Sequence, residues 1–138
     1  MGKDIDKSRR FLVVDDQSTV RRIVKHMLVE MGYTQVHEAD DGATALPMLR
    51  SGSFGFLVTD WNMPTMQGLD LLKAVRAESA TANLPVIMLT TEATQQRIME
   101  AAQAGVNGYV IKPFSAATLM DRVNKVLRSL ESTPAQTA

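Results

Sequence analysis

The 138-residue sequence contains no cysteine, which excludes disulfides, thiolate zinc sites and thiol redox chemistry. It also has no apolar run near the roughly 18 to 20 residues that a membrane-spanning helix needs. The N-terminus, MGKDIDKSRR, alternates charges and is unlike a signal or transit peptide. Neither sign of charge is in excess, since 15 Lys and Arg balance 15 Asp and Glu. We therefore expect a cytoplasmic protein, monomeric and without nucleic-acid or membrane partners.

Hydrophobic residues make up 45% of the chain, which suits one compact domain of ordinary size. The apolar pattern occupies residues 9–131, and we expect one domain there. Residues 1–8 and 132–138 are polar and are predicted to be flexible tails. From this organisation we expect no separate output domain.

Five short apolar segments predict β-strands. Three of them are continuous runs, typical of strands covered on both faces of a parallel sheet, at residues 11–14, 56–59 and 85–89. Two weaker strands are expected at residues 36–39 and 109–111.

Segments with helical periodicity separate and follow these strands. An apolar stripe from Ile23 to Met31 predicts a helix that is capped by Ser18 or Thr19 and ended by Gly32. Further helices are expected around residues 43–49, 69–75, 93–104 and 119–130. Pro47 should shorten or bend the first of these, because proline lacks a backbone donor. The alternation of strand and helix predicts an α/β fold, a three-layer sandwich around a parallel sheet.

Polar side chains follow the predicted strands at their carboxyl ends, where open parallel sheets bind ligands. Asp15 and Asp16 follow the first strand, Asp60 the third, Thr90 the fourth and Lys112 the fifth. Clustered carboxylates need a cation, and an oxygen-only donor set favours Mg²⁺. An ammonium and a hydroxyl opposite the ion would bind phosphoryl oxygens, and one carboxylate could be the nucleophile. Each residue alone is more often a helix cap or a solvated loop residue, but their coincidence at one edge favours a phosphoryl-transfer site.

Six segments of the chain form a highly specific combination. They are VVDD (13–16), STVRRIV (18–24), EADDG (38–42), DWNMP (60–64), AAQAG (101–105) and GYVIKPF (108–114). With them the sequence resembles the receiver domains of two-component response regulators, most closely the chemotaxis regulators of the CheY type, from about Phe11 to Leu130. The resemblance implies a flavodoxin-like (βα)5 fold, strand order 2-1-3-4-5 and a cis peptide bond between Lys112 and Pro113.

Carried over by residue, the resemblance makes Asp60 the phospho-acceptor from the phosphohistidine of a sensor kinase or from a small acyl phosphate. Asp16 and Asp60 would bind Mg²⁺ directly, Asp15 through a metal-bound water, and Asn62 through its backbone carbonyl. Such proteins catalyse only their own phosphorylation and dephosphorylation, so an enzyme in the usual sense is not expected.

The resemblance also assigns a switch. Lys112 would pair with the phosphoryl group, Thr90 would swing toward it, and Tyr109 would follow inward. The side chains of Asn62 and Glu92 would tune attack by water, with a partner phosphatase as a further means of dephosphorylation.

The resemblance also implies a partner surface on the fourth helix, the fifth strand and the fifth helix. Its residues here are Thr94, Gln95, Ile98, Ile111 and Arg122. Thr94 and Gln95 replace a commonly basic pair, and Thr91 replaces an alanine that usually follows the switch threonine. The expected output partner is the flagellar motor switch. The alternatives are a phosphate sink or a regulator of a non-flagellar chemosensory pathway.

A function of another class, a small Mg²⁺-dependent phosphatase, would also use an aspartate nucleophile. Phosphatases of the haloacid dehalogenase type place a second acid two positions later, where this chain has Asn62. A flavin or dinucleotide binder is disfavoured because no glycine-rich phosphate-binding turn follows the first strand. His26 and His37 lie away from the predicted edge and are given no catalytic role, whereas Trp61 is expected beside the site.

Overall fold

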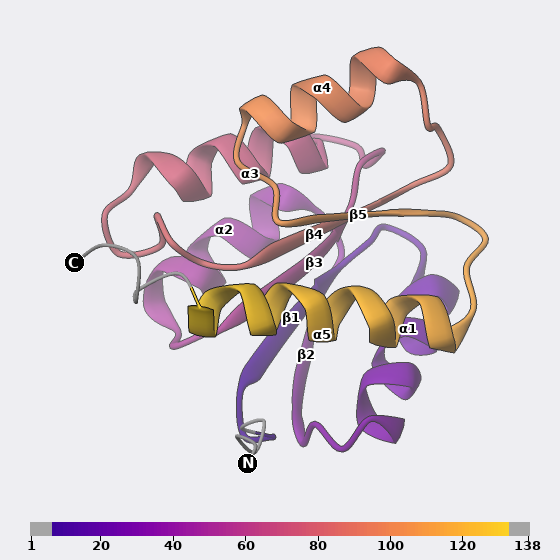
Figure 1. Ribbon diagram of the computed structural model, residues 1–138. Coiled ribbons are helices and arrows are strands. Elements are labelled where there is room, and N and C mark those ends of the chain that lie inside the picture. Colours follow the sequence, from indigo (N-terminus) through magenta and orange to yellow (C-terminus); the bar gives the residue numbers. More distant parts are fainter. Residues whose placement is uncertain (1–6, 133–138) are drawn as a thin grey trace.

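The computed structural model describes residues 7–132, in which five strands and five helices alternate (Figure 1). The elements are β1 (Arg10–Val14), α1 (Ser18–Glu30), β2 (Gln35–Ala39), α2 (Gly42–Ser51), β3 (Phe56–Asp60), α3 (Gly68–Ala77), β4 (Val86–Thr90), α4 (Gln95–Gln103), β5 (Gly108–Ile111) and α5 (Ala116–Ser132). All neighbouring strands are parallel, and their order is β2-β1-β3-β4-β5. Both the predicted α/β sandwich and the strand order implied by the resemblance are confirmed.

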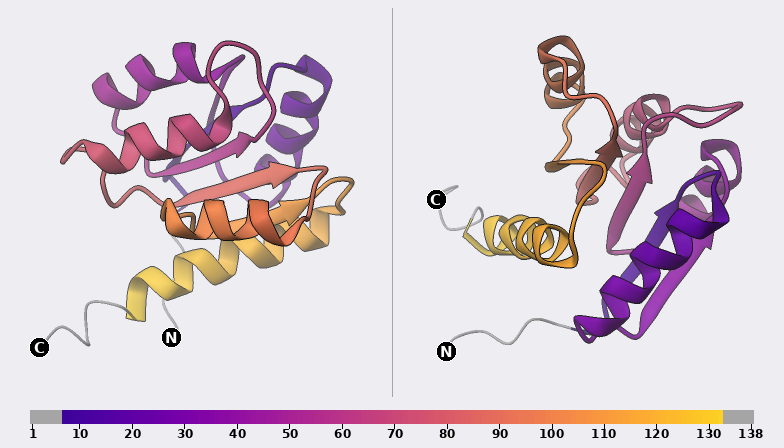
Figure 2. Two further views of the ribbon diagram at one scale, coloured as in Figure 1. Left: turned by 90° about the horizontal axis from the view of Figure 1, so that it is seen from above. Right: turned by 90° about the vertical axis from the view of Figure 1, so that its right-hand side faces the viewer.

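The sheet lies between two layers of helices, with α1 and α5 on one face and α2, α3 and α4 on the other (Figure 2). Successive side chains of a strand point to opposite faces. Accordingly, Phe11 of β1 packs in a core with Leu28 of α1, whereas Leu12 packs in a second core with Leu72 of α3. β3 and β4 are buried along their whole length, which explains their continuous apolar sequence.

The expected cap of α1 is wrong. The helix begins at Ser18 itself, and Gln17 is the N-cap residue without a side-chain cap hydrogen bond. The backbone N–H of Gln17 donates to Oδ1 of Asp15 at 2.9 Å, so Asp15 forms the turn that precedes the helix. The end of the helix agrees with the prediction, because Gly32 has a positive φ of 104° just beyond it.

The predicted effect of Pro47 is also wrong in one respect, because α2 continues to Ser51. Proline costs the helix one backbone hydrogen bond, but Ala45, Leu46 and Leu49 are buried against the sheet and hold the helix in place. Tertiary packing therefore outweighs the local penalty.

The fourth helix starts two residues later than expected. Thr94 is its N-cap, and the Thr94 hydroxyl accepts a hydrogen bond from the backbone N–H of Arg97 at 3.2 Å. A capping threonine has extended rather than helical backbone angles, so α4 begins at Gln95.

Most of the two predicted tails, residues 1–6 and 133–138, lies outside the described residues, and the limits of the domain at 9–131 stay a prediction. Lys7 lies next to the predicted start of the domain, and its Nζ is 4.5 Å from the centre of the Tyr33 ring. Within the described range, no helix has the length and apolar character to cross a lipid bilayer.

Candidate functional site

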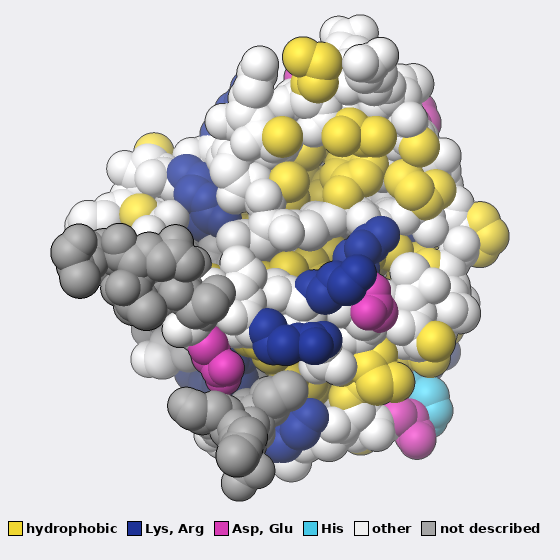
Figure 3. Space-filling view, in the orientation of Figure 1, with side chains coloured by type: hydrophobic (Ala, Val, Ile, Leu, Met, Phe, Trp, Pro, Cys, Tyr) yellow, Lys and Arg dark blue, Asp and Glu magenta, His cyan; other side chains and the backbone are white. Residues whose placement is uncertain are grey.

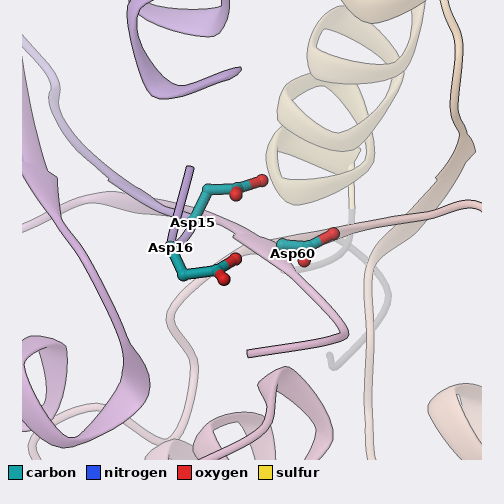
Figure 4. A group of neighbouring side chains, drawn as sticks. All are labelled: Asp15, Asp16 and Asp60. Atoms are coloured by element: carbon teal, nitrogen blue, oxygen red, sulfur yellow. The ribbon is translucent and has the colours of Figure 1, made fainter. Parts of the chain in front are cut away.

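Three carboxylates meet at the carboxyl edge of the sheet (Figure 4). Asp15 and Asp16 follow β1, and Asp60 ends β3, the strand beside it. One oxygen from each residue lies within 4.8 Å of the others. Asp15 and Asp60 are only 1% and 6% exposed, whereas Asp16 is exposed to solvent. Mutual repulsion at such distances favours a cation between the acids.

Lys112, the residue directly after β5, brings a positive charge to this cluster. Its Nζ is 2.8 Å from Oδ1 of Asp60 and 3.1 Å from Oδ2 of Asp15. The backbone N–H of Lys112 donates to the carbonyl of Thr90 at 2.7 Å, and the peptide bond to Pro113 is cis, as the resemblance implies. One ammonium faces three carboxylates, so the cluster keeps a net negative charge.

The charges of this cluster change its proton affinities. Burial raises the pKa of Asp60 above the ordinary aspartate value, while the hydrogen bond from Lys112 opposes that shift and the charge of Asp15 adds to it. Burial by itself lowers the pKa of Lys112, but the hydrogen bond and charge of Asp60 and the charge of Asp15 outweigh it and raise the pKa overall. Lys112 is therefore firmly protonated beside Asp60.

The loop after β3 returns close to the strand end and depends on Gly68. The backbone N–H of Gly68 donates to the carbonyl of Trp61 at 2.9 Å. A Cβ at position 68 would overlap the backbone carbonyl oxygen of Asp60. Only glycine lets α3 begin this close to the carbonyl of Asp60.

The predicted switch residues, Thr90 and Tyr109, are linked through Glu92. Thr90 is fully buried, and its Oγ1 accepts a hydrogen bond from the backbone N–H of Glu92 at 3.1 Å. The hydroxyl of Tyr109 donates to the backbone carbonyl of Glu92 at 3.0 Å. The Tyr109 ring lies edge-on to the buried Trp61 ring, with 6.3 Å between centroids. Burial raises the pKa of Tyr109, so its hydroxyl stays protonated and able to donate.

Sequence reasoning missed Arg97. Its Nε is 3.1 Å from a carboxylate oxygen of Glu92, its guanidinium lies 4.5 Å from the centre of the Trp61 ring, and one Nη is 3.4 Å from Oδ1 of Asn62. One signal was present in the sequence, because a cation in the first turn of a helix opposes the helix dipole and needs a local partner.

The predicted partner surface is formed by α4, β5 and α5. Ile98 and Ile111 are 43% and 39% exposed, and Figure 3 shows hydrophobic side chains gathered over this face with basic ones beside them. Thr94 and Gln95 are exposed at the start of α4. Arg122 and Tyr109 line an open hollow of about 370 Å³ between β5 and α5.

Neither histidine belongs to the acid cluster. His26 lies on α1 with its Nε2 3.7 Å from Glu30, and the His37 ring packs edge-on against Phe54.

Comparison with known proteins agrees with this geometry. Residues 11–124 match the response regulator receiver domain family. The chain is 56% identical over 126 residues to chemotaxis protein CheY-3 of Vibrio cholerae, covering 91% of this chain and 97% of that protein. It is 60% identical over 117 residues to chemotaxis protein CheY of Pseudomonas aeruginosa, covering 85% and 94%.

Solved structures show the same relationship. A crystallised Vibrio cholerae chemotaxis protein, CheY4, superposes with a TM-score of 0.81 at 36% sequence identity, over 86% of this chain and 98% of that one. The Francisella response regulator 1452 receiver domain superposes with a TM-score of 0.79 at 30% identity, over 88% and 98%. The chain belongs to the response regulator receiver domain family, and within that family of signalling proteins it is of the CheY type.

Proposed function

We propose that this protein is a cytoplasmic, phosphorylation-activated response regulator of chemotaxis, in which Asp60 accepts a phosphoryl group from a histidine kinase. The observation that carries the proposal is the buried Asp60 carboxylate, which Lys112 contacts beside two further acids at the carboxyl edge of a parallel sheet. The high identity to chemotaxis proteins supports the pathway.

In the proposed reaction, a carboxylate oxygen of Asp60 attacks the phosphorus of a phosphohistidine or of a small acyl phosphate. A bond from this oxygen to phosphorus forms while the bond from phosphorus to the donor nitrogen or oxygen breaks, and the donor leaves with the electron pair. Lys112, already within hydrogen-bonding distance of Asp60, would bind a phosphoryl oxygen and balance the added negative charge.

The acid cluster fits a Mg²⁺ ion, because its three closely spaced donors are all carboxylate oxygens. We assign Asp16 and Asp60 as direct ligands, Asp15 as a ligand through water, and the backbone carbonyl of Asn62 as a further ligand. When bound, the ion would neutralise the acids and the incoming phosphoryl group.

The proposed switch runs from Thr90 to Tyr109. Thr90 would turn its hydroxyl toward the phosphoryl group and give up the hydrogen bond that it accepts from Glu92. The Tyr109 hydroxyl is bonded to the carbonyl of that same residue, so its position would change with Thr90. This movement would alter the partner surface of α4, β5 and α5, on which Ile98 and Ile111 are exposed.

The first experiment uses Trp61, a single tryptophan beside the acids, as a reporter. Its fluorescence is followed while Mg²⁺ and then beryllofluoride or acetyl phosphate are added to the wild type and to Asp60→Ala. A Mg²⁺-dependent change with the phosphoryl reagent that the variant lacks is the expected result. No change in a folded wild type would contradict the proposal.

The second experiment tests the output, for which we propose the flagellar motor switch. Phosphorylated protein should bind a motor-switch peptide more tightly than unmodified protein does. The exchange of a common basic pair for Thr94 and Gln95, and the presence of Thr91, favour a second candidate, a phosphate sink or a regulator of another chemosensory pathway. Rapid draining of phosphate from the kinase without peptide binding would select that candidate.

A further inference from the structure

Arg97 is the one residue of α4's first turn that turns toward the proposed phosphorylation site. It is partly buried, whereas the neighbouring residues 94–96 and 98–100 are exposed. Its guanidinium lies between three side chains at the site, contacting the Glu92 carboxylate at 3.1 Å, the Asn62 amide oxygen at 3.4 Å and the face of the Trp61 ring.

The location of Arg97 indicates that these contacts determine its orientation. The Thr94 hydroxyl caps the backbone N–H of Arg97, so this residue occupies the third position of α4, near the positive end of the helix dipole. A cation is disfavoured there, so attraction to Glu92 and to the Trp61 ring must offset that cost.

The guanidinium contacts both side chains, Glu92 and Asn62, to which the resemblance assigns tuning of dephosphorylation. In hydrolysis, a water oxygen attacks phosphorus and forms a new bond while the bond from phosphorus to the Asp60 oxygen breaks. The products are the free Asp60 carboxylate and dihydrogen phosphate. Nearby acceptors orient the hydrogens of the attacking water. The carboxylate of Glu92 and the amide oxygen of Asn62 are possible acceptors for that water, and Arg97 pairs with the first as an ion pair and donates a hydrogen bond to the second. While they are engaged they are less able to orient the water.

We propose that Arg97 is a positioning residue that slows loss of the phosphoryl group by restraining Glu92 and Asn62. The inference rests on the proposed function, because it concerns the lifetime of phosphorylated Asp60. It assigns a role in signal duration to a residue that is neither a nucleophile nor a metal ligand nor part of the Thr90 and Tyr109 switch.

The test measures the decay of radiolabelled phosphoryl groups on purified wild type, Arg97→Ala and Arg97→Lys, with excess donor removed. Arg97→Ala should shorten the lifetime by about threefold or more. Arg97→Lys should rescue part of the effect, because an ammonium keeps the charge but cannot contact both acceptors as a fork. Arg50→Ala is the matched control, since it removes another surface arginine paired with a glutamate, Glu78, at 2.6 Å, and its lifetime should equal that of the wild type.

A double-mutant cycle separates positioning from a general structural effect. When Asn62 and Glu92 are both changed to alanine, the further change of Arg97 to alanine should no longer affect the lifetime. In metal-free buffer, Arg97→Ala should also alter the emission of Trp61, because the guanidinium no longer covers the ring.

The possible failures are distinguishable. If the wild type is labelled and the phosphoryl lifetime of Arg97→Ala is unchanged or longer, the inference about Arg97 is wrong and the proposed function stands. If Arg97→Ala still shortens the phosphoryl lifetime when Asn62 and Glu92 are both alanine, Arg97 does not act by positioning those two side chains. Absence of label on folded wild type overturns the proposed function and, with it, the inference.

Discussion

The ammonium nitrogen of Lys112 lies 2.8 Å from a carboxylate oxygen of Asp60, and it is also 3.1 Å from Asp15, which is 97 residues away in the chain. Both carboxylates are buried. Lys112 therefore offsets charge within the cluster as well as being placed to bind a phosphoryl oxygen.

Replacing this ammonium should destabilise the protein. In Lys112→Met, Asp15 and Asp60 stay buried without their countercharge, and we expect a loss of about 3 kcal/mol in the free energy of unfolding. Urea unfolding in metal-free buffer measures this loss, with Lys125→Met as control because the ion pair of Lys125 with Asp121 is exposed. Equal losses in the two variants would contradict the structural role of Lys112.

Asp60→Asn should stabilise the protein more at neutral than at acidic pH. The raised pKa means that folded Asp60 holds its proton at a higher pH than the unfolded chain does. The folded state therefore binds more protons in the window above the ordinary aspartate pKa, and wild-type stability falls as the pH rises through it. The variant lacks this loss, so its stability advantage over the wild type should grow as the pH rises from below the ordinary aspartate pKa to neutral pH.

The measurement is urea unfolding at several pH values with a chelator present. Asp70→Asn is the control, because Asp70 is an exposed residue of α3 outside the cluster. If the difference in unfolding free energy between wild type and Asp60→Asn does not change with pH, the pKa of Asp60 is not raised in the folded protein.

Gly68→Ala should damage both stability and the proposed phosphorylation. The added methyl group would overlap the backbone carbonyl of Asp60, so the loop or the strand end must shift. We expect a loss of about 2 to 3 kcal/mol and slower labelling by acetyl phosphate. Gly108→Ala is a milder comparison because its new Cβ would meet the Ile87 side chain at 3.0 Å, an obstacle that can adjust. If Gly68→Ala has the stability and the labelling rate of the wild type, the loop tolerates a side chain that its geometry excludes.

Arg76→Met should weaken the fold without altering phosphoryl chemistry. The guanidinium of Arg76 donates to the carbonyls of Leu84 and Gly105 at 2.6 and 2.8 Å and to Oδ1 of Asn107 at 2.8 Å. These acceptors precede β4 and β5, at the sheet edge opposite the acids. Burial lowers the pKa of Arg76, yet the group remains a cation.

Losing these bonds should cost about 2 to 4 kcal/mol in unfolding free energy, and the rate of labelling by acetyl phosphate should stay that of the wild type. Arg50→Met is the control for loss of an exposed arginine. A slower labelling rate in folded Arg76→Met would contradict this prediction, because it would mean that the contacts of Arg76 influence the acid cluster at the opposite edge of the sheet.

The sequence by itself determined the α/β class and the edge at which the acids meet. Continuous apolar runs marked β1, β3 and β4 as buried parallel strands, and the residues after them were Asp15, Asp60 and Thr90. Carboxyl ends of parallel strands share one edge, so their convergence follows from chain direction alone.

Only the tertiary structure decided which distant side chains contact one another. Arg76 reaches the carbonyl of Gly105, 29 residues away, and Arg97 reaches Asn62, 35 residues away. Pro47 stays within a helix because buried neighbours hold it there. Local periodicity reports which face of an element is apolar, but such contacts depend on how helices pack over the sheet, and this is set by the fit of the whole core.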